Sequence, residues 1–420
     1  MKNIELLSPA GSFDCMQAAI NAGADAVYFG VEQLNMRARS VNTFTIDDLK
    51  EISVLAKSNN IKSYITLNTV MYEHDMQLLR NILLEVKKHR IDAVIASDFA
   101  VIEQCNQLQI PLHISTQANV SNIDSVKFFS RFADVIVLAR ELTLKQVGHI
   151  TSEIKRKNIT GPSGQLVKIE IFVHGALCMA VSGKCYLSLH SQNASANRGA
   201  CVQNCRRPYI VKDAETGEEL LIDNEYIMSP KDLCTIGVMN ELINSGADVF
   251  KIEGRTKGSD YVHITTACYK EAMIAVQENT YSKDKIDEWM KRLSSVYNRG
   301  FWEGYYLGHN MGEWTPHPGS IATEKKIYVG KGSKYYPKIR VAEFHLDSGT
   351  ISQGDTILIS GKHCGMAKSV IDKLIVNGME KPVAVKGDKI TFPFEDKITI
   401  HDKLYKIVDS TDDKNNSIQE

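Results

Sequence analysis

The chain has 420 residues, of which 43% are hydrophobic and 24% are charged, a composition typical of globular domains and not of disordered segments. Its 49 basic and 50 acidic residues give a formal net charge of -1, so overall charge neither predicts nor excludes a nucleic-acid partner. No apolar run reaches the roughly 20 residues of a membrane helix, and the opening MKNIELLSPAGS lacks the pattern of a signal peptide. We therefore expect a cytoplasmic protein with no membrane partner, in which thiols stay reduced.

A recurring phrase predicts the fold of the first three quarters of the chain. It combines a helix end, an aspartate turn and a short run rich in Val and Ile, and it occurs at residues 22–30, 90–98, 131–139 and 245–253. Further apolar runs at 4–11, 63–70, 112–118 and 168–175 bring the expected strands to eight. Alternation with helical segments predicts a (β/α)8-type barrel over residues 1–320, with an open doubly wound sheet as the alternative.

Polar residues that follow the expected strands are the candidates for a functional site, because barrel enzymes place their sites where the strands end. Five are cations, and they predict an anionic ligand, since guanidinium groups bind carboxylate or phosphate in bidentate fashion: Arg37, Arg39, Arg140, Lys251 and Arg255. His174 and Glu253 are the candidates for proton transfer, although a structural hydrogen bond is the more common role of either side chain.

The hydrophobic pattern changes towards the carboxyl end. From about Tyr328 to Val408 the residues alternate with period two, with Gly-Asp turns at 354–355 and 387–388, which predicts a small β-barrel at 325–410. Within it KGSKYYPKIR, at 331–340, interleaves cations with two tyrosines, a pattern that suits RNA docking and a solvated edge strand equally well. Residues 411–420 have too little apolar content to pack, so we expect a frayed tail.

Four of the chain's nine cysteines are clustered, with the spacing Cys178-x6-Cys185-x15-Cys201-x3-Cys205. Structural zinc sites usually contain tight C-x2-C pairs, which this segment lacks. An iron–sulfur cluster accepts looser spacing, because its thiolate ligands need only converge on the cluster. The spacing therefore favours a cluster, with zinc and packing or disulfide-forming thiols as the alternatives. Cys234 is expected to be a core thiol, with a role as a spare ligand as the alternative.

Other catalytic motifs are absent from the sequence. It contains no HExxH, GxSxG, P-loop or GxGxxG pattern. His174 lies four residues before Cys178, so a Cys–His nucleophilic pair is a further hypothesis. That pair needs a free thiolate, so the hypothesis fails if Cys178 is a cluster ligand.

Four stretches carry a family resemblance: ELLSPAGSFDCMQAAINAGADAVYFG, FVHGALCMAVSGKCYLS, RGACVQNCR and DVFKIEGRTK. They resemble the collagenase-like peptidase family of unknown catalytic type, the peptidase U32 family, over nearly the whole chain. Within it the cysteine spacing is most similar to that of the prephenate-dependent tRNA uridine hydroxylases, and relatives include an rRNA cytidine hydroxylase and the oxygen-independent hydroxylases of ubiquinone synthesis.

The resemblance implies a 4Fe-4S cluster on Cys178, Cys185, Cys201 and Cys205, with prephenate as the source of a hydroxyl group that is added to the wobble uridine of tRNA. The older peptidase name implies a rival function as a collagenase-like protease. A second rival is a non-catalytic RNA-binding module. Homo-oligomers, or hetero-oligomers with a paralogue, are the assemblies that we consider.

Overall fold

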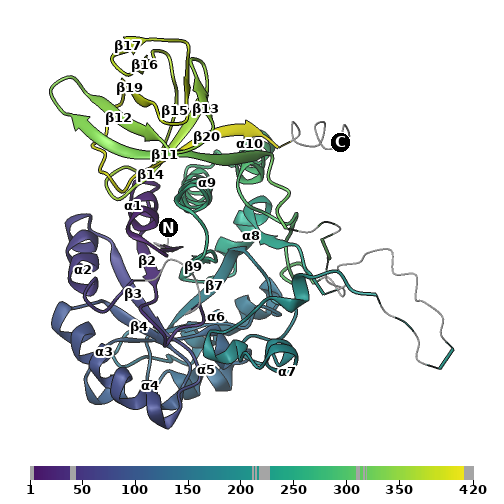
Figure 1. The fold of residues 1–420 in the computed structure, drawn as a ribbon. Coiled ribbons are helices and arrows are strands. Elements are labelled where there is room, and N and C mark those ends of the chain that lie inside the picture. The colour runs from purple at the N-terminus through teal and green to yellow at the C-terminus, as the bar shows by residue number, and fades with distance from the viewer. Residues whose placement is uncertain are drawn as a thin grey trace.

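The computed structural model describes residues 4–37, 44–210, 212, 215–216, 228–308, 313–315, 317 and 319–410. Arg39 and the expected tail at 411–420 lie outside these residues. In chain order, the described elements form an α/β barrel and then an antiparallel β unit (Figure 1).

Eight parallel strands close into the barrel. Each strand from β1 to β7 pairs with its neighbour in order, and β9 pairs in parallel with both β7 and β1. The strands are β1 (Glu5–Pro9), β2 (Ala26–Phe29), β3 (Lys62–Leu67), β4 (Ala93–Ala96), β5 (Leu112–Ile114), β6 (Val135–Val137), β7 (Lys168–Gly175) and β9 (Val249–Ile252). The predicted barrel is confirmed, and the open doubly wound sheet is wrong.

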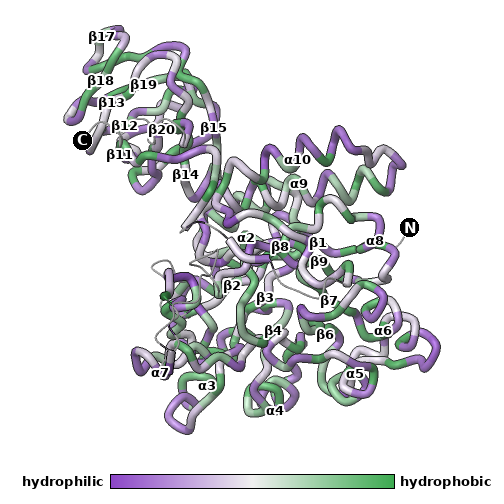
Figure 2. The backbone as a smooth tube through the Cα atoms, turned by 90° about the vertical axis from the view of Figure 1, so that its right-hand side faces the viewer, coloured by the Kyte–Doolittle hydropathy of each residue, from purple (hydrophilic) through white to green (hydrophobic). Residues whose placement is uncertain are grey.

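Helices surround the barrel and bury their apolar sides against it. In α3, for example, the buried residues Leu79, Ile82, Leu83 and Val86 recur at helical spacing. Figure 2 shows hydrophobic strands inside and hydrophilic turns on the outer helices. The helices are α1 (Phe13–Asn21), α2 (Leu49–Ser58), α3 (Met76–His89), α4 (Phe99–Gln107), α5 (Ile123–Phe129), α6 (Leu144–Arg156), α7 (Leu187–Gln192), α8 (Met239–Asn244), α9 (Ser259–Gln277) and α10 (Lys283–Ser295). Among the described residues, none of the helices combines the length and apolar character needed to cross a bilayer.

Two short strands extend the sheet beyond the barrel. The end of β7, at His174 and Gly175, pairs antiparallel with β8 (Asp232–Cys234), and β10 (Phe301–Trp302) pairs in parallel with β8. The chain thus returns from α10 to the end of β7, and it carries Arg299 to the edge of the barrel mouth.

The carboxyl-terminal unit has its own core, which includes Phe344 stacked on Phe392. Its long strand β11 (Glu324–Tyr336) pairs with β12 on one side and β20 on the other, and the register shifts next to Gly330 and Gly332. A Cβ at Gly332 would lie 2.0 Å from the Thr399 carbonyl oxygen, so glycine permits this close approach. The other strands are β12 (Val341–Leu346), β13 (Thr350–Ser352), β14 (Thr356–Gly361), β15 (Gly365–Val370), β16 (Ile375–Val376), β17 (Met379–Glu380), β18 (Val383–Val385), β19 (Lys389–Pro393) and β20 (Lys403–Asp409).

The antiparallel unit packs on α1 and α9 (Figures 1 and 2). Ser360 donates to the Asp14 carboxylate at 2.6 Å and lies 2.8 Å from the Ser259 hydroxyl oxygen. The Asn21 amide donates to the Cys364 carbonyl at 3.0 Å. Because α1 and α9 begin where β1 and β9 end, the contacts of Ser360 with Asp14 and Ser259 hold this part of the unit near the mouth of the barrel.

The 331–340 stretch is an antiparallel strand end and turn whose tyrosines have partners within the unit. Tyr335 donates to the Glu395 carbonyl at 2.7 Å, and Tyr336 donates to the Glu343 carboxylate at 3.0 Å. Arg340 forms an ion pair with Glu395. The strand part of this stretch belongs to β11, which lies between β20 and β12 in the sheet, so the edge-strand explanation is wrong. The intramolecular partners of the tyrosines do not favour RNA docking either.

Candidate functional site

The carboxyl ends of the barrel strands open into a cavity of about 390 Å³. One wall comes from residues at or just after the strands, and the other comes from the cysteine segment, which we define as residues 176–212. The strand-end side chains that line the cavity include Tyr28, Arg37, Asn68, Gln117, Arg140, Lys251, Glu253 and Arg255. Four of the five predicted cations therefore meet at one site, and the fifth, Arg39, lies outside the described residues.

Glu253 is the carboxylate at the centre of this site. It accepts a hydrogen bond from Arg37 at 3.0 Å and another from the Tyr28 hydroxyl at 3.0 Å. Burial alone would raise the pKa of Glu253, but the charges of Arg37, Arg140 and Arg255 lower it to about 2. Glu253 is therefore ionised at neutral pH and holds the arginines in place, which does not suit it as a proton donor.

The arginines of the site differ in whether their donor groups already have hydrogen-bond partners in the protein. Arg255 is buried and donates to Thr66 and Asn35, and burial lowers its pKa to about 10. Arg140 donates to the Ala176 carbonyl at 2.9 Å, but its buried Nε has no partner among the described residues. An unpartnered buried donor that borders a cavity is suited to an acceptor on a ligand.

Lys251 points into the barrel interior. Its Nζ lies 2.7 Å from Glu170 Oε1, and both side chains are almost fully buried. Burial raises the pKa of Glu170 even though Lys251 opposes the shift. Lys251 therefore has a full ionic partner inside the protein before any ligand binds.

His174 is not part of the cavity wall. Its buried ring packs against Tyr261, Tyr269 and Phe301, and its Nδ1 lies 3.4 Å from the Tyr269 hydroxyl. Burial lowers the pKa of His174 to about 3, so the imidazole is neutral. In the described part of the chain no hydrogen bond joins it to Cys178, which leaves the Cys–His hypothesis without support.

The four clustered cysteines all line the cavity and are all free thiols. Cys178 is exposed and the other three are half-buried. Burial raises the pKa of Cys205, the charge of Arg206 opposes the shift, and the charges of the other three cysteines add to it, so the four groups interact electrostatically. Cys234, in contrast, is buried beside Met290 and Tyr269 and does not line the cavity.

The donor set fits an iron–sulfur cluster in its chemistry. It consists of thiols alone, and the whole stretch from 171 to 212 contains no aspartate or glutamate that would favour a harder metal. The side chains are not gathered into a ligand set: within the described residues, no three His, Cys, Asp or Glu side chains are grouped to hold a metal ion. The fold thus places the four thiols around one cavity, and binding a cluster requires further convergence.

Arg198 and Arg206 hold the cysteine segment against the rest of the protein. Arg198 donates to the Val70 carbonyl at 2.9 Å, forms an ion pair with Asp75, and stacks on the ring of Tyr72 with its Cζ 4.2 Å from the centroid. Arg206 donates to the Pro230 carbonyl at 2.6 Å and to the Ser229 hydroxyl at 2.9 Å. These contacts fix the segment across the mouth of the barrel.

The structure adds Lys257 to the site, which the sequence analysis missed. It lines the cavity, and burial together with the charge of Arg299 lowers its pKa to about 7. It lies only two residues after Arg255, so the cations at the end of this strand continue further than the sequence analysis assumed.

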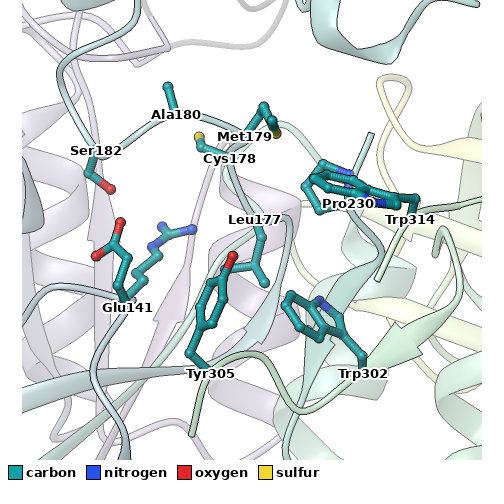
Figure 3. A pocket seen from close by; sticks show the side chains of 11 residues that line it. Glu141, Leu177, Cys178, Met179, Ala180, Ser182, Pro230, Trp302, Tyr305 and Trp314 are labelled. Carbon is teal, nitrogen blue, oxygen red and sulfur yellow. The ribbon is translucent and has the colours of Figure 1, made fainter. Parts of the chain in front are cut away.

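A smaller hollow of about 30 Å³ lies beside Cys178. Figure 3 shows Trp302 and Tyr305 on one side of it and Met179 with Cys178 on the other. Cys178 lines both hollows, so it stands between the main cavity and the smaller aromatic one.

Comparison with known proteins gives consistent matches. Residues 11–316 match the family described as Peptidase family U32. A protein named collagenase from Porphyromonas gingivalis is 50% identical, over 97% of this chain and 98% of its own length. A tRNA hydroxylation protein P of Helicobacter pylori is 35% identical, over 73% of this chain and 72% of its own. A 23S rRNA 5-hydroxycytidine synthase of Escherichia coli is 30% identical, over 88% of this chain and 55% of its own.

Proposed function

The chain belongs to peptidase family U32, and from that premise we propose that it is a cytoplasmic RNA-modifying enzyme that hydroxylates a pyrimidine base. More narrowly, we propose that it converts the wobble uridine of tRNA to 5-hydroxyuridine, with prephenate as the source of the hydroxyl group. Relatives named for tRNA hydroxylation and for 5-hydroxycytidine synthesis support the reaction class.

The observation that carries the proposal is the meeting of four free thiols and a set of cations on one cavity. We propose that Cys178, Cys185, Cys201 and Cys205 hold a 4Fe-4S cluster. Ordinary acid–base side chains cannot oxidise an unactivated ring carbon, and such a cluster, when bound, supplies electron-transfer chemistry.

The cationic wall suits prephenate, which carries two carboxylates. Arg140 offers its unpartnered Nε, and Lys257 has an amine stacked on Tyr297 and no carboxylate within ion-pair distance in the described structure. Arg37 and Arg255 are oriented by Glu253, Thr66 and Asn35 and present a fixed positive field. Fixed cations orient a dianion at little reorganisation cost.

A wobble base is accessible to such a site. It lies in a single-stranded anticodon loop, so it can be turned out at a modest unstacking cost and no duplex has to open. A cavity of about 390 Å³ accommodates small aromatic groups.

The test is mass spectrometry of tRNA nucleosides from cells that lack this protein, with any paralogue or oxygen-dependent enzyme also removed. We expect 5-hydroxyuridine derivatives to disappear, and to return with the wild-type chain but not with Cys185→Ser. An unchanged nucleoside profile would refute the proposal.

A collagenase-like peptidase is the second candidate, and the relative named collagenase favours it. A cysteine peptidase needs a base beside its thiolate, and His174 is buried away from the cavity. Cleavage of gelatin by purified protein, abolished by Cys178→Ala and insensitive to iron removal, would establish this candidate in place of the hydroxylase.

A further inference from the structure

The cysteine segment is unlike the rest of the chain in its charge. The whole chain has about one acidic residue in every eight, but residues 171–212 contain none, although they include Lys184, Arg198, Arg206, Arg207 and Lys212. The segment therefore adds a positively charged lip to the mouth of the barrel, although the protein as a whole is close to neutral.

The cations of this lip differ in whether the protein already uses them. Arg198 and Arg206 are used in holding the segment against the rest of the protein. Lys184 and Arg207 are exposed, and neither is ion-paired with a carboxylate of the described residues. Lys184 also lines the main cavity. Cations that form no ion pair within the protein and lie at the edge of a site are suited to binding phosphate groups.

An exposed aromatic side chain lies two residues after Lys184. Tyr186 immediately precedes α7, is 71% exposed, and lines the cavity from the same lip as Lys184. Its hydroxyl has no hydrogen-bond partner among the described residues, unlike those of Tyr335 and Tyr336 in the carboxyl-terminal unit. An exposed aromatic ring in the same segment as unpaired cations is the combination that binds unpaired bases.

We propose that the cysteine segment is the surface that grips single-stranded RNA. Tyr186 stacks on an unpaired base next to the one that enters the cavity, while Lys184 and Arg207 neutralise the flanking phosphates. This inference rests on the proposed RNA-modifying function and assigns its docking surface to the mouth of the barrel and not to the carboxyl-terminal sheet.

The first test measures binding of a fluorescent uridine-rich single-stranded RNA, and of a duplex of matched composition, to the anaerobically purified full chain. The double variant Lys184→Glu/Arg207→Glu should bind the single strand at least about tenfold more weakly. Its logarithmic salt dependence should flatten by about 1.4, because each phosphate contact on a single strand contributes roughly 0.7. Iron content and circular dichroism should match those of the wild type.

Two matched controls carry the same change in charge. Lys87→Glu/Lys127→Glu places it on the outer helices α3 and α5, and should leave affinity unchanged. Lys334→Glu/Lys338→Glu places it on the carboxyl-terminal unit. If this last variant weakens binding while Lys184→Glu/Arg207→Glu does not, the docking surface is the sheet and the inference is wrong.

The second test separates stacking from charge. Tyr186→Ala should lower single-strand affinity about five- to one-hundred-fold without changing the salt slope, whereas Tyr186→Phe should retain wild-type affinity. Equal affinity for all three proteins would overturn the role of Tyr186. Met179 and Val181 also expose apolar side chains in this segment. Binding of a protein, and not of RNA, to this surface would overturn the whole inference.

The outcomes distinguish the proposed RNA-docking surface from the proposed hydroxylation. If cells show tRNA hydroxylation that depends on this protein but both sets of variants bind RNA normally, only the docking surface is refuted. If binding depends on Tyr186 and Lys184 but no hydroxylated nucleoside depends on the protein, only the hydroxylation is refuted.

Discussion

The buried pair Lys251–Glu170 allows a quantitative prediction about a residue that sequence reasoning placed in the ligand site. The two charged atoms lie 2.7 Å apart, and the side chains of Lys251 and Glu170 are 6% and 0% exposed. Glu170 Oε2 has no hydrogen-bond partner in the described structure, so the contact of Oε1 with Lys251 is the main compensation that the carboxylate receives. Removing the amine therefore leaves an unpaired charge in the barrel interior.

We predict that Lys251→Met lowers the free energy of unfolding by about 3–5 kcal/mol, the usual cost of breaking a buried ion pair from one side. The double variant Lys251→Met/Glu170→Leu should recover most of this loss, because neither charge then remains. Lys283→Met, which breaks the exposed pair with Asp287, should cost less than about 1 kcal/mol.

The loss should depend on pH in a defined direction. The pKa of Glu170 is already raised by burial, and losing Lys251 removes the charge that opposes this shift. A carboxyl whose folded pKa exceeds its unfolded pKa binds more protons in the folded state, so stability falls as pH rises between the two values. Lys251→Met should therefore be more destabilising at pH 8 than at pH 5.

The assay is the urea dependence of intrinsic fluorescence at both pH values, with the shift in midpoint compared at constant slope. If Lys251→Met unfolds at the wild-type midpoint, the pair is not the structural element that its geometry indicates, and Lys251 returns to the set of residues that bind ligand.

Three further predictions follow from the site. Arg198→Ala should lower retained iron and increase hydrogen exchange in residues 178–205, because it removes the contacts to Asp75 and Val70; exchange and iron content equal to those of the wild type would contradict this. Glu253→Gln should flatten the acid-denaturation curve, because the pKa of this carboxyl is lowered to about 2 in the folded protein. Such a group contributes stability above its unfolded pKa of about 4.3, at most about 3 kcal/mol, and that contribution is lost as the pH falls through 2. An unchanged curve would argue against stabilisation of Glu253 by the arginines. Cys178→Ser should lose iron on anaerobic purification while the buried Cys268→Ser keeps it, and full iron in Cys178→Ser would remove that ligand.

The barrel could be predicted from sequence because its signal is local. Four strands are short Val- and Ile-rich runs after a small-residue helix end, four more are apolar runs, and all eight runs form barrel strands. The strands β8 and β10 could not be predicted in this way. They are two or three residues long, and they pair only because β7 extends past the barrel rim.

The candidate site, like the fold, could be predicted from the sequence only in part. The meeting of Arg37, Arg140, Arg255 and the four cysteines follows from their positions at strand ends and in one segment. What each group does depends on partners distant in sequence. Glu170 is 81 residues from Lys251, and the aromatic cage of His174 comes partly from α9 and β10. Burial by such partners, which sequence spacing does not reveal, separates a ligand-binding lysine or catalytic histidine from a structural one.

The most direct test of the central claim is the origin of the hydroxyl oxygen. Anaerobically purified protein is incubated with undermodified tRNA and with prephenate that carries a heavy oxygen isotope in its hydroxyl group, and the nucleosides are weighed by mass spectrometry. We predict 5-hydroxyuridine that contains the heavy isotope, formed without molecular oxygen. Hydroxylated nucleoside without the isotope, or formed only when oxygen is admitted, would contradict that claim.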